Sequence, residues 1–329
     1  MRLVPAAHSL LETALTHAHS PNPHPAPPQI DLITDFAGSM NFVLVALLSL
    51  CAGHSISGST AWSPTPHPRA LAMFGVLLLA RVSLAAYLLR RVVKRGHDAR
   101  FDAMRAHAPS FAVFWLMQAL WAWGCSLPVV WLAAESGAGG GGPPLSAGDG
   151  VALAAALGGW ALEVAADAQK DAWRADPARA RAVCSAGVWS WSRHPNFAGE
   201  MALWWGIWAL GLPGYGSAAG ALGALLSPLL TMALLLGVSG MPTAEGAHQR
   251  RFMRSPEEAA AYSAYREATS PILPLPPGAY ARIPRPIKRW LLCEWDRYAC
   301  PPAEAQVEAA PADKAAPLMG AANAAYGST

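Results

Sequence analysis

The sequence predicts an all-α protein, a polytopic membrane helix bundle of about six to seven spans. Its 329 residues are 53% hydrophobic and only 14% charged, whereas roughly a quarter of the residues are charged in an ordinary soluble domain. Six apolar segments approach the length that a helix needs to cross about 30 Å of hydrocarbon. Cationic residues gather in every second linker between these segments, which is typical of linkers that stay in the cytosol.

Residues 1–35 are polar and rich in histidine and proline, and we predict a disordered tail there. The membrane domain is expected over residues 36–300. Residues 301–329 are rich in alanine and proline without a packing pattern, which predicts a second disordered tail. The six expected spans are Phe36–Ser57, Arg69–Leu89, Phe111–Ala134, Gly150–Ala166, Phe197–Leu212 and Ala218–Val238.

Two linkers contain nearly all the cationic residues that lie between the spans, and the alternate linkers are almost empty of them. The cationic residues are Arg90, Arg91, Lys94, Arg95, Arg100 and Arg105 in one linker, and Lys170, Arg174, Arg179, Arg181 and Arg193 in the other. This alternation predicts a multi-pass integral membrane protein with both termini in the cytosol. If the chain is eukaryotic, the endoplasmic reticulum is the membrane we expect. Near the C-terminus, Arg282–Ala299 is expected to form a basic, Trp-containing helix in the membrane surface.

The stretch Arg193-His194-Pro195-Asn196 begins the fifth span. Pro195 lacks a backbone N–H and favours an extended conformation at His194, so a helix should begin here. Asn196 suits a helix cap, and the free N–H groups of a helix N-terminus suit an anion such as a phosphate. Glu200 returns to the same face one turn later. This stretch is therefore a candidate ligand site at the cytosolic face.

A polar stripe leaves the fourth span, because Glu163, Asp167, Lys170 and Arg174 are spaced four, three and four residues apart. At about 100° per residue they share one helix face. One interpretation is a series of ion pairs that stabilises a helix end. The other is one wall of a ligand site, in which carboxylates bind ribose or amide groups and cations bind phosphates.

Two residues of the second span also need a partner or a role. Arg81 is an intramembrane charge, and such charges are costly, so we expect an interior partner such as Glu163 or a bound phosphate. Tyr87 is either an interfacial aromatic residue or a proton donor to a developing enolate.

Several other classes are not favoured. The formal net charge of +3 is too small to argue for nucleic acid as a partner, and no basic run with interleaved aromatic residues resembles a nucleic-acid module. Five scattered cysteines favour neither a disulfide framework nor a metal site. No Gly-x-Ser-x-Gly motif indicates a catalytic triad, and the glycines at 139–142 follow no strand, so they do not form a dinucleotide-binding fingerprint.

A series of blocks resembles the steroid 5α-reductase C-terminal domain family of membrane reductases, most closely the branch known as DUF1295. The blocks are Arg81–Arg91, Asp98–Arg105, Gln118 with Leu127-Pro128, Glu163–Lys170, Gly187–Gly206, Ser239–Pro242 with Glu245, and Tyr262-x-x-Tyr265 with Pro271 and Pro274. The Arg-His-Pro-Asn block alone also fits sterol Δ14-reductases and isoprenylcysteine carboxyl methyltransferases.

The resemblance implies an NADPH-dependent oxidoreductase of lipid metabolism that reduces an activated C=C bond in a hydrophobic, steroid-like or long-chain substrate drawn from the bilayer. Tyr87 and Glu163 are the candidate catalytic residues. The resemblance implies cofactor contacts by Arg100, Asp167, Gln169, Lys170, Arg174, Arg193, His194, Asn196, Glu200, Glu245, Tyr262, Tyr265 and Arg266.

The chain departs from the family pattern where a Tyr-Ser-Arg-His-Pro-Asn-Tyr-Phe-Gly-Glu sequence is usual, because it carries Trp191, Phe197 and Ala198. Phe197 can neither donate a proton nor bond a cofactor, which leaves the proton donor open. Two alternatives remain: a membrane methyltransferase that uses S-adenosylmethionine, and a non-catalytic protein of the same fold.

Overall fold

The structure is a computed structural model that describes residues 34–57, 67–95, 108–137, 142–179, 182–253 and 255–295. Nearly all of the expected N-terminal tail, the whole C-terminal tail and Arg100 lie outside the described residues. Within these ranges the regular structure is helical, and extended backbone pairs only at an isolated parallel bridge between Ser192 and Ser270. The predicted all-α class is confirmed.

Six long helices fall on the six predicted spans. They are α2 (Thr34–Ser57), α3 (Pro68–Arg95), α5 (Ala108–Gly137), α6 (Ala147–Ala175), α7 (Pro195–Gly211) and α8 (Ala218–Met232), and α8 continues through a π-helical turn (Ala233–Val238) into α9 (Met241–Phe252). Among the described residues, five helices are long and apolar enough to cross a membrane. The remaining one, α7, has 17 residues and rises about 26 Å. The chain is therefore a multi-pass membrane protein by the length and composition of its helices.

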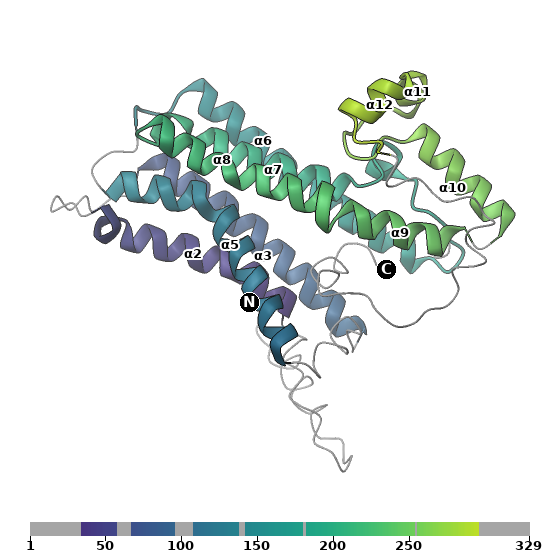
Figure 1. Ribbon diagram of the computed structural model, residues 1–329, viewed down its shortest axis with the longest axis horizontal. Coiled ribbons are helices and arrows are strands. Elements are labelled where there is room, and N and C mark those ends of the chain that lie inside the picture. Colours follow the sequence, from purple (N-terminus) through teal and green to yellow (C-terminus); the bar gives the residue numbers. More distant parts are fainter. Residues whose placement is uncertain are drawn as a thin grey trace, which may run out of the picture.

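Helices that follow one another in the chain alternate in direction, so each of the two ends of the bundle gathers starts and ends of helices (Figure 1). At one end, Arg91 at the end of α3 pairs with Asp35 at the start of α2, with 3.4 Å between Nη2 and Oδ2. Arg90 pairs there with Asp171 near the end of α6, at 3.3 Å. We call this the cationic end. At the other, which we call the Arg69 end, Arg69 at the start of α3 pairs with Asp149 at the start of α6.

Helices α6 and α7 lie so close that their backbones touch. A Cβ atom added to Gly159 of α6 would lie 2.5 Å from the carbonyl oxygen of Gly199 in α7, and one added to Gly206 would lie 2.5 Å from the backbone nitrogen of Ala156. Small residues at a helix contact permit this approach, which membrane helices use because lipid tails leave packing as the main attraction. The approach brings the polar stripe of α6 beside the start of α7.

A cap covers the cationic end and consists of α10 (Pro256–Ala268), α11 (Pro277–Arg282), α12 (Arg285–Leu291) and the segment before α11 (Figure 1). Arg193 and His194 donate backbone N–H groups to the carbonyl oxygens of Ser270 and Pro271, at 2.8 and 3.1 Å. The Ser192 hydroxyl donates to the Ile272 carbonyl at 2.8 Å. These bonds fix His194 as the N-cap of α7, and the helix begins at Pro195 as the sequence predicts. The extended conformation expected at His194 is wrong, because its φ of −137° and ψ of 62° are neither extended nor helical.

The prediction of a single helix over Arg282–Ala299 is wrong. α11 ends at Arg282, and the range contains the short helix α12, which stops at Leu291. Pro284 and Pro286 supply no backbone N–H for a continuous helix, which explains the break.

Candidate functional site

A cavity of about 300 Å³ lies between α3 and α6 and contains both candidate catalytic residues. Small and aliphatic side chains form most of its wall. Its complete lining is Ala80, Ser83, Leu84, Ala86, Tyr87, Arg90, Glu163, Val164, Asp167 and Ala168. The Tyr87 hydroxyl donates to Oδ1 of Asp171 at 3.2 Å, beside the Arg90–Asp171 ion pair. The structure therefore brings Tyr87, Glu163 and Asp167 to one apolar cavity.

The deep side of this cavity adjoins a buried charge cluster. Nη2 of Arg81 lies 2.6 Å from Oε2 of Glu200, so the interior partner that we expected for Arg81 is a carboxylate of α7. The Trp204 indole donates to Oε1 of Glu200 at 2.8 Å. Glu163 is 3% exposed, and its Oε1 atom has no hydrogen-bond partner among the described residues. A buried carboxyl oxygen without a partner is costly, which makes Glu163 a candidate to contact a ligand.

A second, smaller hollow lies at the cationic end of the same helix, and we call it the cationic hollow. It measures about 20 Å³, and its wall combines cations and aromatic rings. The complete lining is Lys170, Trp173, Arg174, Ala182, Val183, Cys184, Trp189, Arg193, His248, Phe252 and Tyr265. None of these lining residues carries a carboxylate. The polar stripe of α6 thus divides, because Glu163 and Asp167 line the apolar cavity and Lys170 and Arg174 line the cationic hollow.

One wall of the cationic hollow is a short 3₁₀ turn, Gly187–Ser190, that three side chains hold in place. Gln169 accepts a hydrogen bond from the backbone N–H of Val188 at 2.9 Å. The Trp189 indole donates to the Ala166 carbonyl at 2.8 Å, and the Tyr265 hydroxyl donates to the Trp189 carbonyl at 2.7 Å. The ammonium of Lys170 lies 4.5 Å from the centre of the Trp189 ring. Gln169 and Tyr265 therefore shape this wall directly.

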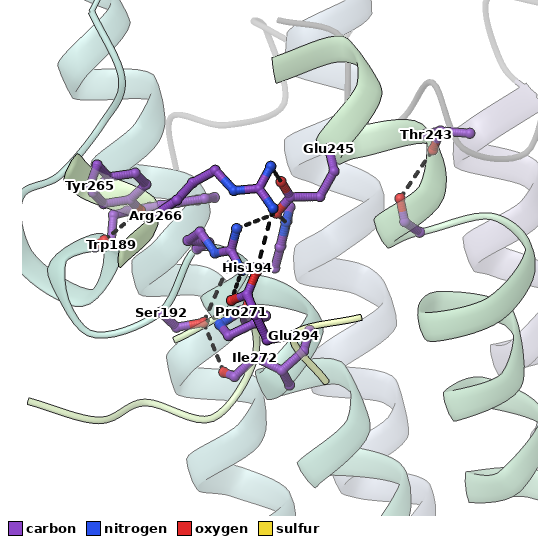
Figure 2. Close-up of polar contacts among 12 residues, drawn as sticks. Trp189, Ser192, His194, Thr243, Glu245, Tyr265, Arg266, Pro271, Ile272 and Glu294 are labelled. Carbon is purple, nitrogen blue, oxygen red and sulfur yellow. Dashed lines mark hydrogen bonds and ion pairs between the residues drawn. The ribbon is translucent and has the colours of Figure 1, made fainter. Parts of the chain in front are cut away.

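Glu245 of α9 is the centre of a buried network at the start of α7 (Figure 2). Its Oε1 lies 2.8 Å from Nε2 of His194 and 3.4 Å from Nη1 of Arg193. Its Oε2 lies 3.4 Å from Nη1 of Arg266 and accepts from the Tyr262 hydroxyl at 3.3 Å. Burial lowers the pKa of His194, although the Glu245 carboxylate opposes this shift. Five predicted cofactor residues thus contact one another, and their assignment to a cofactor stays a prediction.

Glu294, which follows α12, was not predicted as a site residue. It pairs with Arg193 and accepts a hydrogen bond from the Tyr280 hydroxyl at 2.7 Å. Arg266 reaches its other oxygen at 3.4 Å. Arg266 contacts both Glu245 and Glu294 (Figure 2). A single carboxylate between Cys293 and Trp295 was the only signal, and it gives no indication of a partner about a hundred residues away in the chain.

His248 is the second residue that sequence reasoning missed. It lines the cationic hollow, and its ring stacks on that of His194 with 5.7 Å between centroids and 2° between planes. The Phe197 ring also stacks on the His194 ring, with 5.1 Å between their centroids. The spacing of three residues from Glu245 on α9 was the available signal.

Asn196 and Glu200 occupy the first turns of α7, but their side chains have different surroundings. Asn196 is 3% exposed, and its Oδ1 atom has no hydrogen-bond partner in the described part of the chain. Glu200 points to Arg81 and Trp204 within the bundle. Asn196 therefore retains acceptor capacity for a ligand, and Glu200 already has two partners.

A comparison with protein-family models matches residues 28–269 to the family described as "Protein of unknown function (DUF1295)". The match covers well over half of the chain, including all six long helices and the Glu245 network up to α10. Comparisons with curated proteins and with solved structures give no match.

Proposed function

The chain belongs to the DUF1295 family, and from the geometry of its two hollows we propose that it is an integral membrane reductase. It would use NADPH to reduce an activated C=C bond of a hydrophobic substrate. The observation that carries this proposal is the pair of hollows along one face of α6, one cationic and aromatic, the other apolar with a phenol and a carboxyl group.

The chemistry of the cationic hollow suits a nucleotide that bears several phosphates. Lys170 and Arg174, one turn apart on α6, supply positive charge to its wall, and Arg193 lines it while pairing with Glu245 and Glu294. The rings of Trp173 and Trp189 offer surfaces on which a base can stack. In this role Lys170 and Arg174 would bind phosphate oxygens, and the Oδ1 atom of Asn196 would accept from an amide or hydroxyl group.

The size of the cationic hollow adds a condition. About 20 Å³ has room for roughly one water molecule, so a dinucleotide enters only if the cap over the hollow moves. The cap segments are held by side-chain contacts to Glu294 and Glu245. Opening therefore requires these contacts to separate, and α10 is the element that would swing away.

The apolar cavity suits the substrate. Its volume of about 300 Å³ matches the lower range of small-molecule sites, and Val164, which is 42% exposed, lies on the side open to lipid. Bound NADPH supplies a hydride. Tyr87 would turn its hydroxyl group from Asp171 to the substrate carbonyl and donate that proton to the oxygen on which the hydride leaves negative charge. Glu163 would contact the substrate from the deep side of the cavity.

The methyltransferase alternative is less well supported by the charges. S-adenosylmethionine carries a positive sulfonium group, which Lys170 and Arg174 would repel. The non-catalytic alternative leaves unexplained the buried, unpartnered oxygens of Glu163 and Asn196, because such atoms cost free energy in a structure that has no ligand for them.

Titration of the full-length protein in neutral detergent tests the proposal. We expect saturable NADPH binding that Arg174→Ala weakens about tenfold or more, because a lost charged hydrogen bond is worth about 1.5–3 kcal/mol. Asn196→Ala should also weaken it. The matched control is Arg282→Ala, an exposed residue outside both hollows, which should bind NADPH like the wild type.

The roles in the apolar cavity are tested by turnover with an enone substrate. Tyr87→Phe should lower kcat and leave NADPH affinity unchanged, because the phenol lies outside the cationic hollow. Unchanged NADPH affinity in both Arg174→Ala and Asn196→Ala, or tighter binding of S-adenosylmethionine than of NADPH, would overturn the proposed function.

A further inference from the structure

Helix α12 is amphipathic, and its apolar face is uncovered among the described residues. Ile287, Trp290 and Leu291 are spaced three and one residues apart and so share one face of the helix. They are 44%, 80% and 70% exposed. Exposed apolar residues are common singly, but three on one face of a seven-residue helix form a patch that calls for an apolar surrounding.

The opposite side of the same segment is cationic. Arg285, Lys288 and Arg289 belong to α12, and Arg282 ends α11 just before it. No acidic residue lies between positions 282 and 291. A helix with an apolar face, an aromatic residue at its edge and basic residues opposite has the features of a helix that lies in a membrane interface.

The position of α12 along the length of the bundle agrees with a place in the membrane interface. Cys293 and Trp295, which follow α12 directly, pack against the cluster that contains Phe197, Ala198 and Met201. Those three residues occupy the first two turns of α7, where the sequence changes from Arg193 and His194 to an apolar run. Figure 1 shows α12 at this end of the bundle and on its outer side. The uncovered face therefore lies near the boundary where a span begins.

We infer that α12 is an interfacial anchor that inserts Ile287, Trp290 and Leu291 among lipid chains and that anionic headgroups bind Arg282 and Arg285. Lys288 is engaged within the cap, since its ammonium lies 4.2 Å from the centre of the Tyr280 ring. The inference does not depend on the proposed reaction. Its consequence for the fold is direct, because α12 precedes Glu294, which ties the cap to Arg193. An anchored α12 would hold that tie in place.

Fluorescence quenching in reconstituted membranes tests the anchor. The full-length chain and Trp290→Phe are placed in phosphatidylcholine vesicles with brominated acyl chains, and their difference spectrum isolates Trp290. Trp123→Phe provides the positive control, because Trp123 lies within α5 and is 55% exposed. We expect brominated chains to quench the Trp290 signal by a fraction similar to that of Trp123, and aqueous acrylamide to quench it little.

The charge part of the inference is tested by adding phosphatidylglycerol. Each basic residue near an anionic surface strengthens attraction about fivefold, so phosphatidylglycerol should increase the quenching of Trp290 by brominated chains. The double variant Arg282→Gln/Arg285→Gln should lose this increase. Strong quenching of Trp290 by acrylamide would overturn the anchor, since the helix would then face water. Protection from both quenchers would also overturn it, since protein would then cover α12. Quenching that does not respond to phosphatidylglycerol would overturn the headgroup contacts.

Discussion

The two ends of the bundle bury arginines in opposite ways. At the Arg69 end, one guanidinium donates to four acceptors: both carboxylate oxygens of Asp149 and the carbonyl oxygens of Pro143 and Pro144. At the cationic end, Arg193 and Arg266 share two carboxylates that come from separate cap and helix segments, Glu245 and Glu294. The first arrangement joins two helix starts and a linker. The second joins parts that, under the proposed function, would separate for a cofactor to enter.

The two arrangements differ in how much free energy it costs to separate their parts. A buried ion pair with several hydrogen bonds is costly to break, because losing one partner leaves the other charge buried and unpaired. A network shared among α7, α9, α10 and the segment after α12 can open in parts. The π-helical turn between α8 and α9 lies beside this network, and such turns occur often at functional sites.

Breaking the Arg69 end should have the largest effect on stability. Arg69→Ala leaves Asp149 buried at 5% exposure without its cation, and we expect a loss of about 3–5 kcal/mol. Thermal unfolding in detergent measures it, with Arg282→Ala as the exposed control. A loss below about 1 kcal/mol would contradict the role given to this pair.

The contact between α6 and α7 should rank second. Gly159→Ala places a methyl group 2.5 Å from backbone atoms of Gly199 and Leu203, and backbone cannot move aside as a flexible side chain can. We expect a loss of about 1–3 kcal/mol. The matched control is Gly158→Ala, whose added methyl group meets nothing within 4 Å. Equal stability of the two variants would show that the helices are not in backbone contact.

Weakening the cap should cost little stability but change access. Glu294→Gln removes a charge from a partly exposed network, for which we expect a loss of about 1 kcal/mol. That loss would raise the population with an open cap about fivefold. Thiol labelling of Cys184 reports it, because this residue lines the cationic hollow and is 7% exposed. Burial also raises the pKa of the Cys184 thiol, which slows its reaction while the cap is closed.

Cys51 is the internal control for that experiment, since it is exposed on α2. Its labelling rate should be the same in Glu294→Gln and in the wild type. If Cys184 labelling is equally unchanged, Glu294 does not hold the cap closed.

How far the sequence predicts this molecule depends on the range of the interactions. The helices follow from apolar length and cationic alternation, and the start of α7 follows from Pro195; both are local signals. The pairing of Arg81 with Glu200 joins residues 119 positions apart, and no periodicity reveals such a partner. The division of the α6 stripe between two hollows depends on which neighbours surround each turn. Glu294 was missed for the same reason, because only the fold of the cap brings it to Arg193.

Protection of Cys184 by NADPH tests most directly whether a nucleotide binds in the cationic hollow. The labelling rates of Cys184 and Cys51 are compared in the full-length protein with NADPH, with S-adenosylmethionine and without addition. We expect NADPH to slow the labelling of Cys184 and to leave that of Cys51 unchanged, and S-adenosylmethionine to change neither rate. Labelling of Cys184 that ignores NADPH at concentrations that saturate binding, or that S-adenosylmethionine slows equally, would contradict NADPH binding in that hollow.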